Sequence, residues 1–257
     1  MEPWRSAIAN SDKTNLWIRG FDITALMKRT TFADVVFLLH QSRLPSVDER
    51  RLIDAILIAV ADHGSGAPSC AAARLVASGN RESLSAAVAA GVLAIGDEHG
   101  GAGADCMENI AAGVKLARSE GIPLEEAAAR MFHEFRSKRK RFAGLGHRVH
   151  TERDPRTEIL FSMARESGLA RDGIVFMEAL ERTAATQASK PLPINIDGAL
   201  AAILYDLGFP SSFGKLLFII GRVAGLTAEV AEEHHREKAM RIKIPIVYDG
   251  PEPRPLD

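Results

Sequence analysis

The sequence predicts an all-α protein. Apolar residues recur with the helical period in one segment after another, and helix-capping residues mark many of the segment ends. Alternating apolar and polar residues, the pattern of a half-buried strand, are nearly missing, and only residues 244–248 look extended. With 257 residues the chain can bury a full core, as one large domain or as two lobes.

The first half of the chain contains three clear helical segments. Residues 83–95 are rich in alanine with Gly91 among them, which predicts a helix packed closely against its neighbours. The next helix is expected over 104–120 and ends at Gly121, a residue type common at helix C-termini. An earlier helix is marked by apolar residues on one face, namely Leu52, Ile53, Ile56 and Val60.

The second half continues the helical pattern. We expect Pro123 in the first turn of a helix over 124–136, and Asp154 as the N-cap of a helix over 157–166. Further helices are expected over residues 175–188, 198–207 and 213–238, and the chain as a whole is expected to form about ten.

Two glycine-bearing breaks are the expected hinges, at residues 100–103 and 208–214. They predict a large helical domain made of residues 1–102 and 208–257. A smaller domain, residues 103–207, is inserted in it.

Composition excludes several classes of partner. The net charge is −1 with 25% charged residues, which gives no electrostatic reason to expect nucleic acid or an anionic membrane. The N-terminus has no signal-peptide pattern, and the most apolar window, 216–226, is too short for a bilayer. Cys70 and Cys106 lack metal-site or disulfide spacing, so we expect buried, reduced thiols in a cytoplasmic protein.

The segment from residue 144 to residue 156 carries the strongest chemical signal. Gly144 and Gly146 let backbone N–H groups approach a ligand, and His147 between glycine and arginine titrates near neutral pH. Arg148 and Arg156 suit carboxylate or phosphate groups. The combination predicts an acid–base step on an anionic substrate.

Two further clusters have the same character. His99 precedes Gly100-Gly101, and alone it fits a ligand-facing group, a buried hydrogen-bonded residue or a helix C-terminal charge equally well. Asp197 opens an apolar helix, where it is either a common N-cap or a carboxylate base in a semi-apolar site.

Other candidates depend on context. His63 near a helix end is structural on its own, while Arg222 interrupts an apolar helix and must be paired or face a ligand. The basic run 136–141 is either solvated surface or a binding site for a phosphorylated cofactor. A metal site made of Asp62, His63, Asp97 and His99 is not expected. The side chains of adjacent residues on a helix point in different directions, so they do not converge on one ion.

In this order and spacing, the three clusters resemble the citrate synthase superfamily, and especially its short citryl-CoA lyase branch. That branch is similar to the C-terminal module of ATP-citrate lyase. The resemblance extends from residues 18–23 to residues 248–250, and its most specific motif is Gly-x-Gly-His-Arg-Val followed by Asp-Pro-Arg, residues 144–156.

The resemblance implies a role for each candidate. Asp197 would be the base at the methyl carbon of acetyl-CoA, and His99 would hydrogen-bond the thioester carbonyl. His147 would exchange a proton with the hydroxyl or ketone of the acid partner. The partner's carboxylates would be held by His63, Arg156 and Arg222. Coenzyme A would be received by Arg139, Lys140, Arg141, Gly144, Gly146 and Arg148.

The implied activity is cleavage of a carboxylated 3-hydroxyacyl-CoA, citryl-CoA or a related thioester, to acetyl-CoA and a 2-oxo acid such as oxaloacetate. Coenzyme A would enter as substrate, with no permanently bound cofactor and no metal. One alternative is a citrate or 2-methylcitrate synthase that also hydrolyses the thioester. Another is a non-catalytic sensor of CoA or dicarboxylates. The family architecture implies a homodimer or higher homo-oligomer, with a small lobe that closes over the substrates.

The chain departs from full-length citrate synthases at both ends. It lacks the longer N-terminal part of their large domain. Alignment on Tyr248 puts Ile244 where they carry an arginine that reaches the partner subunit's site, and Arg241 and Lys243 are the possible substitutes. The missing cation leads to the hypothesis of a less highly charged substrate, such as a citramalyl-type thioester.

Overall fold

The computed structural model describes residues 2–146 and 152–255. Within these residues the chain forms eleven helices and one small three-stranded sheet. The all-α prediction is therefore confirmed.

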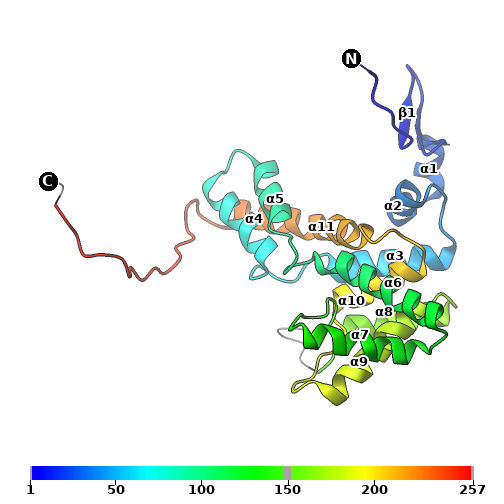
Figure 1. Ribbon diagram of the computed structural model, residues 1–257. Coiled ribbons are helices and arrows are strands. Elements are labelled where there is room, and N and C mark those ends of the chain that lie inside the picture. The colour runs from blue at the N-terminus through cyan, green and yellow to red at the C-terminus, as the bar shows by residue number, and fades with distance from the viewer. Residues whose placement is uncertain (1, 147–151, 256–257) are drawn as a thin grey trace.

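The N-terminal segment projects from the body of the molecule (Figure 1). Strands β1 (Ala9–Ser11), β2 (Leu16–Ile18) and β3 (Phe21–Asp22) pair antiparallel in the order β1-β2-β3. Two short helices follow, α1 (Ile23–Arg29) and α2 (Phe32–Gln41). The sequence analysis missed all five elements: the strands, of two or three residues, are too short to show alternation, and no helix was expected over residues 23–41.

Nine helices make up the body. The expected ones are all present within a few residues of their predicted ends, and α4 is an addition that the sequence analysis missed. They are α3 (Val47–Val60), α4 (Pro68–Gly79), α5 (Leu84–Leu93), α6 (Ala102–Glu120), α7 (Leu124–Ser137), α8 (Pro155–Glu166), α9 (Asp172–Gln187), α10 (Ile196–Asp206) and α11 (Phe213–Arg236).

The helix ends test the capping predictions. Gly121 ends α6 in the left-handed conformation (φ +65°), and Asp154 caps α8, as expected. Pro123 is the N-cap of α7 and lies outside its first turn, contrary to the prediction. The N-cap of α10 is Asn195, whose side chain accepts the Gly198 N–H, so Asp197 is a first-turn residue and not the cap.

The core is built around α10. Residues 199–204 of this helix are at most 1% exposed, and α6, α8, α9 and α11 pack against it. A second, smaller apolar cluster joins α4, α5 and the C-terminal half of α11. Gly91 of α5 touches Leu226 so closely that a Cβ would lie 2.8 Å from its side chain, which confirms the predicted close packing.

The large core is continuous across the predicted domain boundary, since Leu217 and Leu200 belong to the same cluster. The division into two domains stays a prediction. Cys70 and Cys106 are free and buried, as expected. In the described part of the chain, no helix is long and apolar enough to cross a membrane. The expected extended stretch 244–248 forms no strand and lies in an exposed C-terminal tail (Figure 1).

Candidate active site

His99 lies in a tight loop between α5 and α6. Its N–H donates to the Gly96 carbonyl (2.9 Å), and its carbonyl accepts the Gly96 N–H (3.1 Å). Gly100 has a φ of +73°, and a Cβ at this position would lie 2.2 Å from the ring of Phe218. Residue 100 must therefore be glycine, and the loop holds His99 against α11.

The ring of His99 is oriented by Ser69 of α4. The Ser69 N–H donates to His99 Nε2 (3.2 Å), and the Ser69 hydroxyl lies 2.9 Å from the same nitrogen. Because a backbone N–H can only donate, Nε2 is the acceptor and the neutral ring carries its proton on Nδ1. The sequence analysis missed Ser69, which looks like an ordinary residue in the first turn of a helix.

Arg222 is buried in α11 at 2% exposure. Its Nη1 donates to the Ser69 hydroxyl oxygen (3.1 Å), so the serine proton is directed toward His99. Its Nε donates to the Val60 carbonyl (2.9 Å), and its guanidinium lies 4.9 Å from the ring centroid of Phe218. Burial lowers the pKa of Arg222, and nearby carboxylates oppose this shift. The sequence predicted that Arg222 is paired or faces a ligand; in the described part of the chain it has neutral hydrogen-bond partners and no ion pair, so contact with a ligand stays a prediction.

Arg156 is held by the N-cap of its own helix. Asp154, 1% exposed, accepts from Arg156 Nε (2.9 Å) and Nη2 (2.8 Å) in a bidentate pair. Arg156 Nη1 also donates to the Ala59 carbonyl (3.3 Å). The C-terminal carbonyls of α3, at residues 59 and 60, thus bind both arginines, as the negative end of a helix dipole favours.

Asp197 lies in the first turn of α10. Burial raises its pKa to about 6, the positive charges of Arg156 and Arg222 oppose the rise, and the charge of Asp154 adds to it. A carboxyl group with this pKa exchanges protons readily near neutral pH. The functional interpretation of Asp197 is therefore favoured over the capping one.

These contacts join four predicted residues into one site. His99 and Arg222 are linked through Ser69. The positive charges of Arg156 and Arg222 act on Asp197 and lower its pKa. The arrangement combines a neutral histidine donor, a carboxyl group that titrates near neutrality and two oriented cations. Such a set can stabilise an enolate while it holds an anionic substrate.

The glycine loop packs on the start of α10. The Gly144 carbonyl accepts the Asn195 N–H (3.0 Å), and Asn195 Nδ2 donates to the Gly146 carbonyl (2.8 Å). Gly144 has a φ of +89°, and a Cβ there would lie 2.6 Å from Cys106 Sγ. The predicted coenzyme loop is thus adjacent to the helix that carries Asp197.

Three further candidates of the predicted site are His147, Arg148 and His63. His147 and Arg148 lie outside the described residues. His63 is exposed in the turn that follows α3, next to Asp62, whose carboxylate accepts the Gly64 N–H (2.6 Å).

The described residues contain one set of three side chains with metal-ligand spacing, Asp62, Cys70 and Glu229. It differs from the set weighed from the sequence. The Cys70 thiol donates to Asp62 (3.4 Å), and Glu229 forms an ion pair with Arg74 (2.6 Å). These side chains therefore already interact with one another or with a cation.

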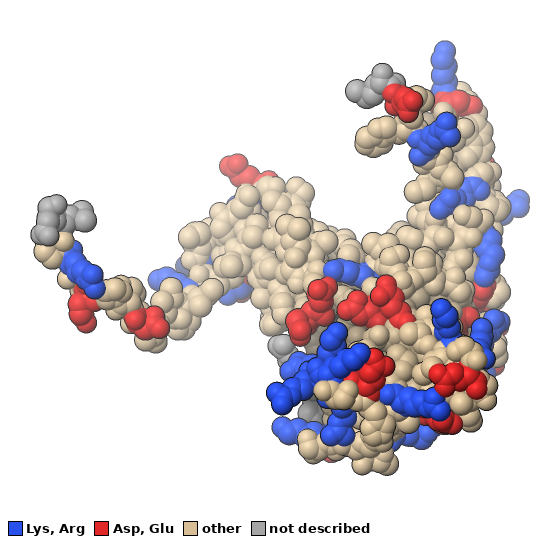
Figure 2. Space-filling view, in the orientation of Figure 1, with Lys and Arg blue, Asp and Glu red and all other residues tan. Residues whose placement is uncertain are grey.

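The basic run borders an aromatic cavity of about 270 Å³. Lys140, Arg141 and Leu145 line it beside three phenylalanines, Phe132, Phe135 and Phe142. Arg139 is exposed on the adjoining turn with a φ of +54°. Figure 2 shows Lys and Arg side chains gathered over this lower part of the molecule.

Arg241 in the C-terminal tail is bound to glutamates of its own chain. Arg241 donates from Nε to Glu233 (2.9 Å) and also pairs with Glu237 (3.0 Å). Since Glu233 is fully buried and also binds Arg74, Arg241 anchors the tail to α11 of its own chain.

The chain was compared with known protein families and structures. Residues 45–243 match the family "Citrate synthase, C-terminal domain". A peroxisomal citrate synthase from Dictyostelium discoideum is 29% identical over 207 residues, which is 78% of this chain and 40% of that protein. The chain therefore spans less than half the length of this curated relative.

Two solved structures are also similar. The citryl-CoA lyase from Hydrogenobacter thermophilus has a TM-score of 0.90 and 37% identity, over 100% of this chain and 98% of that one. The ATP citrate lyase from Methanosaeta concilii, in complex with (3S)-citryl-CoA, has a TM-score of 0.75 and 21% identity, over 97% of this chain and 43% of that one. The expected citrate synthase-like fold is confirmed.

Proposed function

This chain belongs to the citrate synthase family, and from that premise we propose that it is a carbon–carbon lyase of the citryl-CoA lyase type. The observation that carries the proposal is the likeness to a citryl-CoA lyase along nearly the full length of both chains. The substrate would be a carboxylated 3-hydroxyacyl-CoA, and the products acetyl-CoA and a 2-oxo acid such as oxaloacetate.

In the cleavage direction His147 would remove the hydroxyl proton, and the C–O bond would become the carbonyl of the 2-oxo acid. The electrons of the broken C–C bond pass to the acetyl-CoA enolate, whose oxygen accepts a hydrogen bond from His99 Nδ1–H. Protonated Asp197 then delivers a proton to the enolate carbon. A pKa of about 6 leaves part of the Asp197 population protonated at neutral pH.

The two arginines would bind the substrate carboxylates. Arg156 uses three of its five N–H groups on Asp154 and Ala59, so two remain for a ligand. Arg222 keeps at least one N–H beyond its bonds to Val60 and Ser69. We place His63 beside them because it follows the end of α3, to which both arginines bind.

Coenzyme A would enter as a substrate, without a permanently bound cofactor or metal. The cavity beside Lys140 and Arg141 has the aromatic walls and positive charge that a nucleotide requires. We assign Arg139, Arg148 and the backbone of Gly144 and Gly146 to the same region.

A synthase is the second candidate, favoured by the citrate synthases among the relatives. It would join the same fragments and then hydrolyse the thioester. Because Arg241 is bound within its own chain, Lys243 is the remaining cation near Ile244. If Lys243 does not replace the arginine of the citrate synthases, the substrate is expected to carry fewer carboxylates than citryl-CoA.

We further propose a homodimer or larger homo-oligomer in the cytoplasm, with small molecules as its partners and neither nucleic acid nor membrane among them. Helix α5 is apolar on all sides, although Leu84 and Leu93 are 49% and 85% exposed. An apolar helix of this kind is normally covered. A second copy would cover it. The lobe of residues 103–207 would close over the substrates.

Mass spectrometry tests the reaction type. The protein is mixed with acetyl-CoA and either oxaloacetate or pyruvate, with a no-enzyme control. An intact hydroxyacyl-CoA adduct supports a lyase running in reverse, and the acid that reacts names the substrate. Free CoA with a free hydroxy acid supports the synthase. Binding of CoA without any product would support the non-catalytic sensor.

A further inference from the structure

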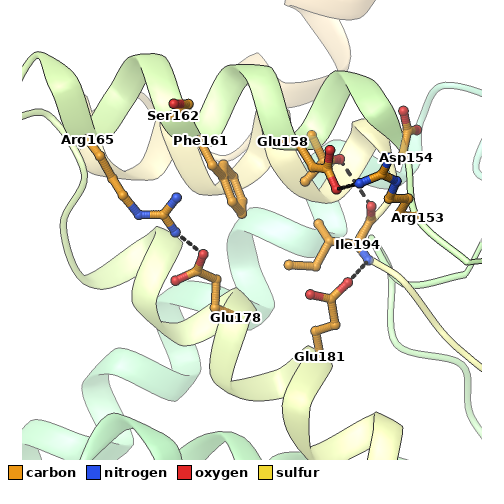
Figure 3. A pocket seen from close by; sticks show the side chains of 10 residues that line it. Arg153, Asp154, Glu158, Phe161, Ser162, Arg165, Glu178, Glu181 and Ile194 are labelled. Carbon is orange, nitrogen blue, oxygen red and sulfur yellow. Dashed lines mark hydrogen bonds and ion pairs between the residues drawn. The ribbon is translucent and has the colours of Figure 1, made fainter.

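A second cavity, of about 340 Å³, lies between α8 and α9 (Figure 3). Both helices pack against α10, and the groove between them is floored by Ile194. None of the roles proposed above uses this space.

Among the residues that the structure describes, one carboxylate of the cavity has no matching cation. At one end Arg165 of α8 pairs with Glu178 of α9, and at the other Arg153 pairs with Glu158 at 2.9 Å (Figure 3). Glu181 lies between these pairs. In the described part of the chain it forms no ion pair, and it accepts only the Ile194 N–H (2.7 Å).

The residues that line the cavity are connected to those of the candidate active site. The Ile194 carbonyl accepts a hydrogen bond from the Thr157 hydroxyl (3.1 Å), so both backbone polar groups of Ile194 are held by cavity residues. The next residue, Asn195, caps the helix that carries Asp197. Asp154, which orients Arg156, lines the same cavity.

We propose that this cavity binds a small aliphatic amine in its ammonium form, with the ammonium on Glu181 and the carbon chain against Phe161. A charge-assisted hydrogen bond to a half-buried carboxylate is strong, and an aromatic ring favours a neighbouring cation. An anionic ligand would meet the uncompensated charge of Glu181 and is excluded.

Binding also reaches the catalytic segment. An ammonium group on Glu181 neutralises the carboxylate that accepts the Ile194 N–H, so this hydrogen bond loses its charge assistance and the segment before α10 is held less firmly. Turnover is then expected to fall. This consequence depends on the proposed function, whereas binding itself does not.

Isothermal titration calorimetry with n-butylamine tests the site, at constant ionic strength and pH 7.5. The neutral analogue 1-butanol serves as the ligand control. Glu181→Gln removes the charge but keeps an oxygen that accepts the Ile194 N–H, and the exposed Glu82→Gln is the matched control variant. We expect saturable binding of the amine alone, unchanged in Glu82→Gln and weakened about tenfold or more in Glu181→Gln.

Equal heats for amine and alcohol, or equal affinities of the two variants, would overturn the proposal. The comparison of amine with alcohol needs no variant, so it decides even if Glu181→Gln does not fold. Amine binding with unchanged cleavage of citryl-CoA would overturn the regulatory part. If the proposed function is wrong, no cleavage of citryl-CoA will be seen with or without the amine. The calorimetric titration will still show that the amine binds.

Discussion

Replacing Ser69 with alanine should damage both stability and turnover. The change removes the hydroxyl that lies 2.9 Å from His99 Nε2 and accepts Arg222 Nη1 at 3.1 Å. A neutral hydrogen bond contributes about 1 kcal/mol and one to a charged group about 1.5–3 kcal/mol. We therefore expect Ser69→Ala to lower the free energy of unfolding by about 2–4 kcal/mol. Turnover should fall by about 10- to 100-fold, because His99 loses a partner that fixes its donor nitrogen.

Ser78 provides the matched control on the same helix. It is 2% exposed, and its hydroxyl oxygen has no hydrogen-bond partner in the described part of the chain. Because Ser78→Ala removes a buried hydroxyl that has no partner among the described residues, it should leave the free energy of unfolding unchanged or raise it by about 1 kcal/mol. Urea unfolding measures both variants, citryl-CoA cleavage measures turnover, and ¹⁵N NMR reports the tautomer of His99. Equal stability and turnover of the two variants would refute the chain of contacts described above.

Three further predictions use the same assays. Asp197→Asn should abolish turnover, yet raise the free energy of unfolding at pH 8 by up to about 3 kcal/mol. A pKa of about 6 in the folded protein, against 3.8, means that the carboxyl group costs stability as pH rises through this window. The same pH dependence of unfolding in Asp197→Asn and in the parent protein would contradict that pKa. Asp206→Ala should cost about 3 kcal/mol in urea unfolding, because its buried carboxylate accepts three backbone N–H groups at the start of α9. Full stability of this variant would mean that other groups satisfy them. Gly144→Ala should destabilise the protein by more than about 2 kcal/mol, since its Cβ would meet Cys106 Sγ at 2.6 Å. Gly208→Ala, also at positive φ but with open space around its Cβ, should cost only about 1 kcal/mol, and equal losses would contradict the steric argument.

The sequence predicted the features that depend on local pattern. The period of the apolar residues located the helices of the body, and the Asp154-Pro155 pair marked the start of α8. Arg222 was identified because a charge inside an apolar helix requires a partner. Gly121 marked a helix end because glycine adopts the left-handed conformation easily.

The features that were missed depend on contacts between distant segments. Ser69 gains its role only because α4 packs near the loop of His99, 30 residues away. The N-cap of α10 is Asn195, whereas the sequence analysis weighed capping for Asp197 only, as the alternative to a catalytic role; Asn and Asp are both good capping residues, and the two lie two positions apart. The N-terminal strands have too few residues for their pairing to leave a periodic signal.

The end of α3 explains how two cations can stay in a mostly buried site. Burial alone disfavours each guanidinium, and the pKa of Arg222 is lowered for that reason. The carbonyls of Ala59 and Val60 offset this by supplying fixed partial negative charge without a proton to lose. A carboxylate in the same place would compete with an anionic substrate for the arginines, whereas a helix end orients them and leaves N–H groups free for a ligand. Full negative charges act on both arginines as well: Asp154 pairs with Arg156, and the charges of Asp62 and Asp197 favour the charged form of Arg222. Although Asp154 binds Arg156, both arginines still act on Asp197, and Arg156 more than Arg222 holds its pKa near neutrality rather than higher.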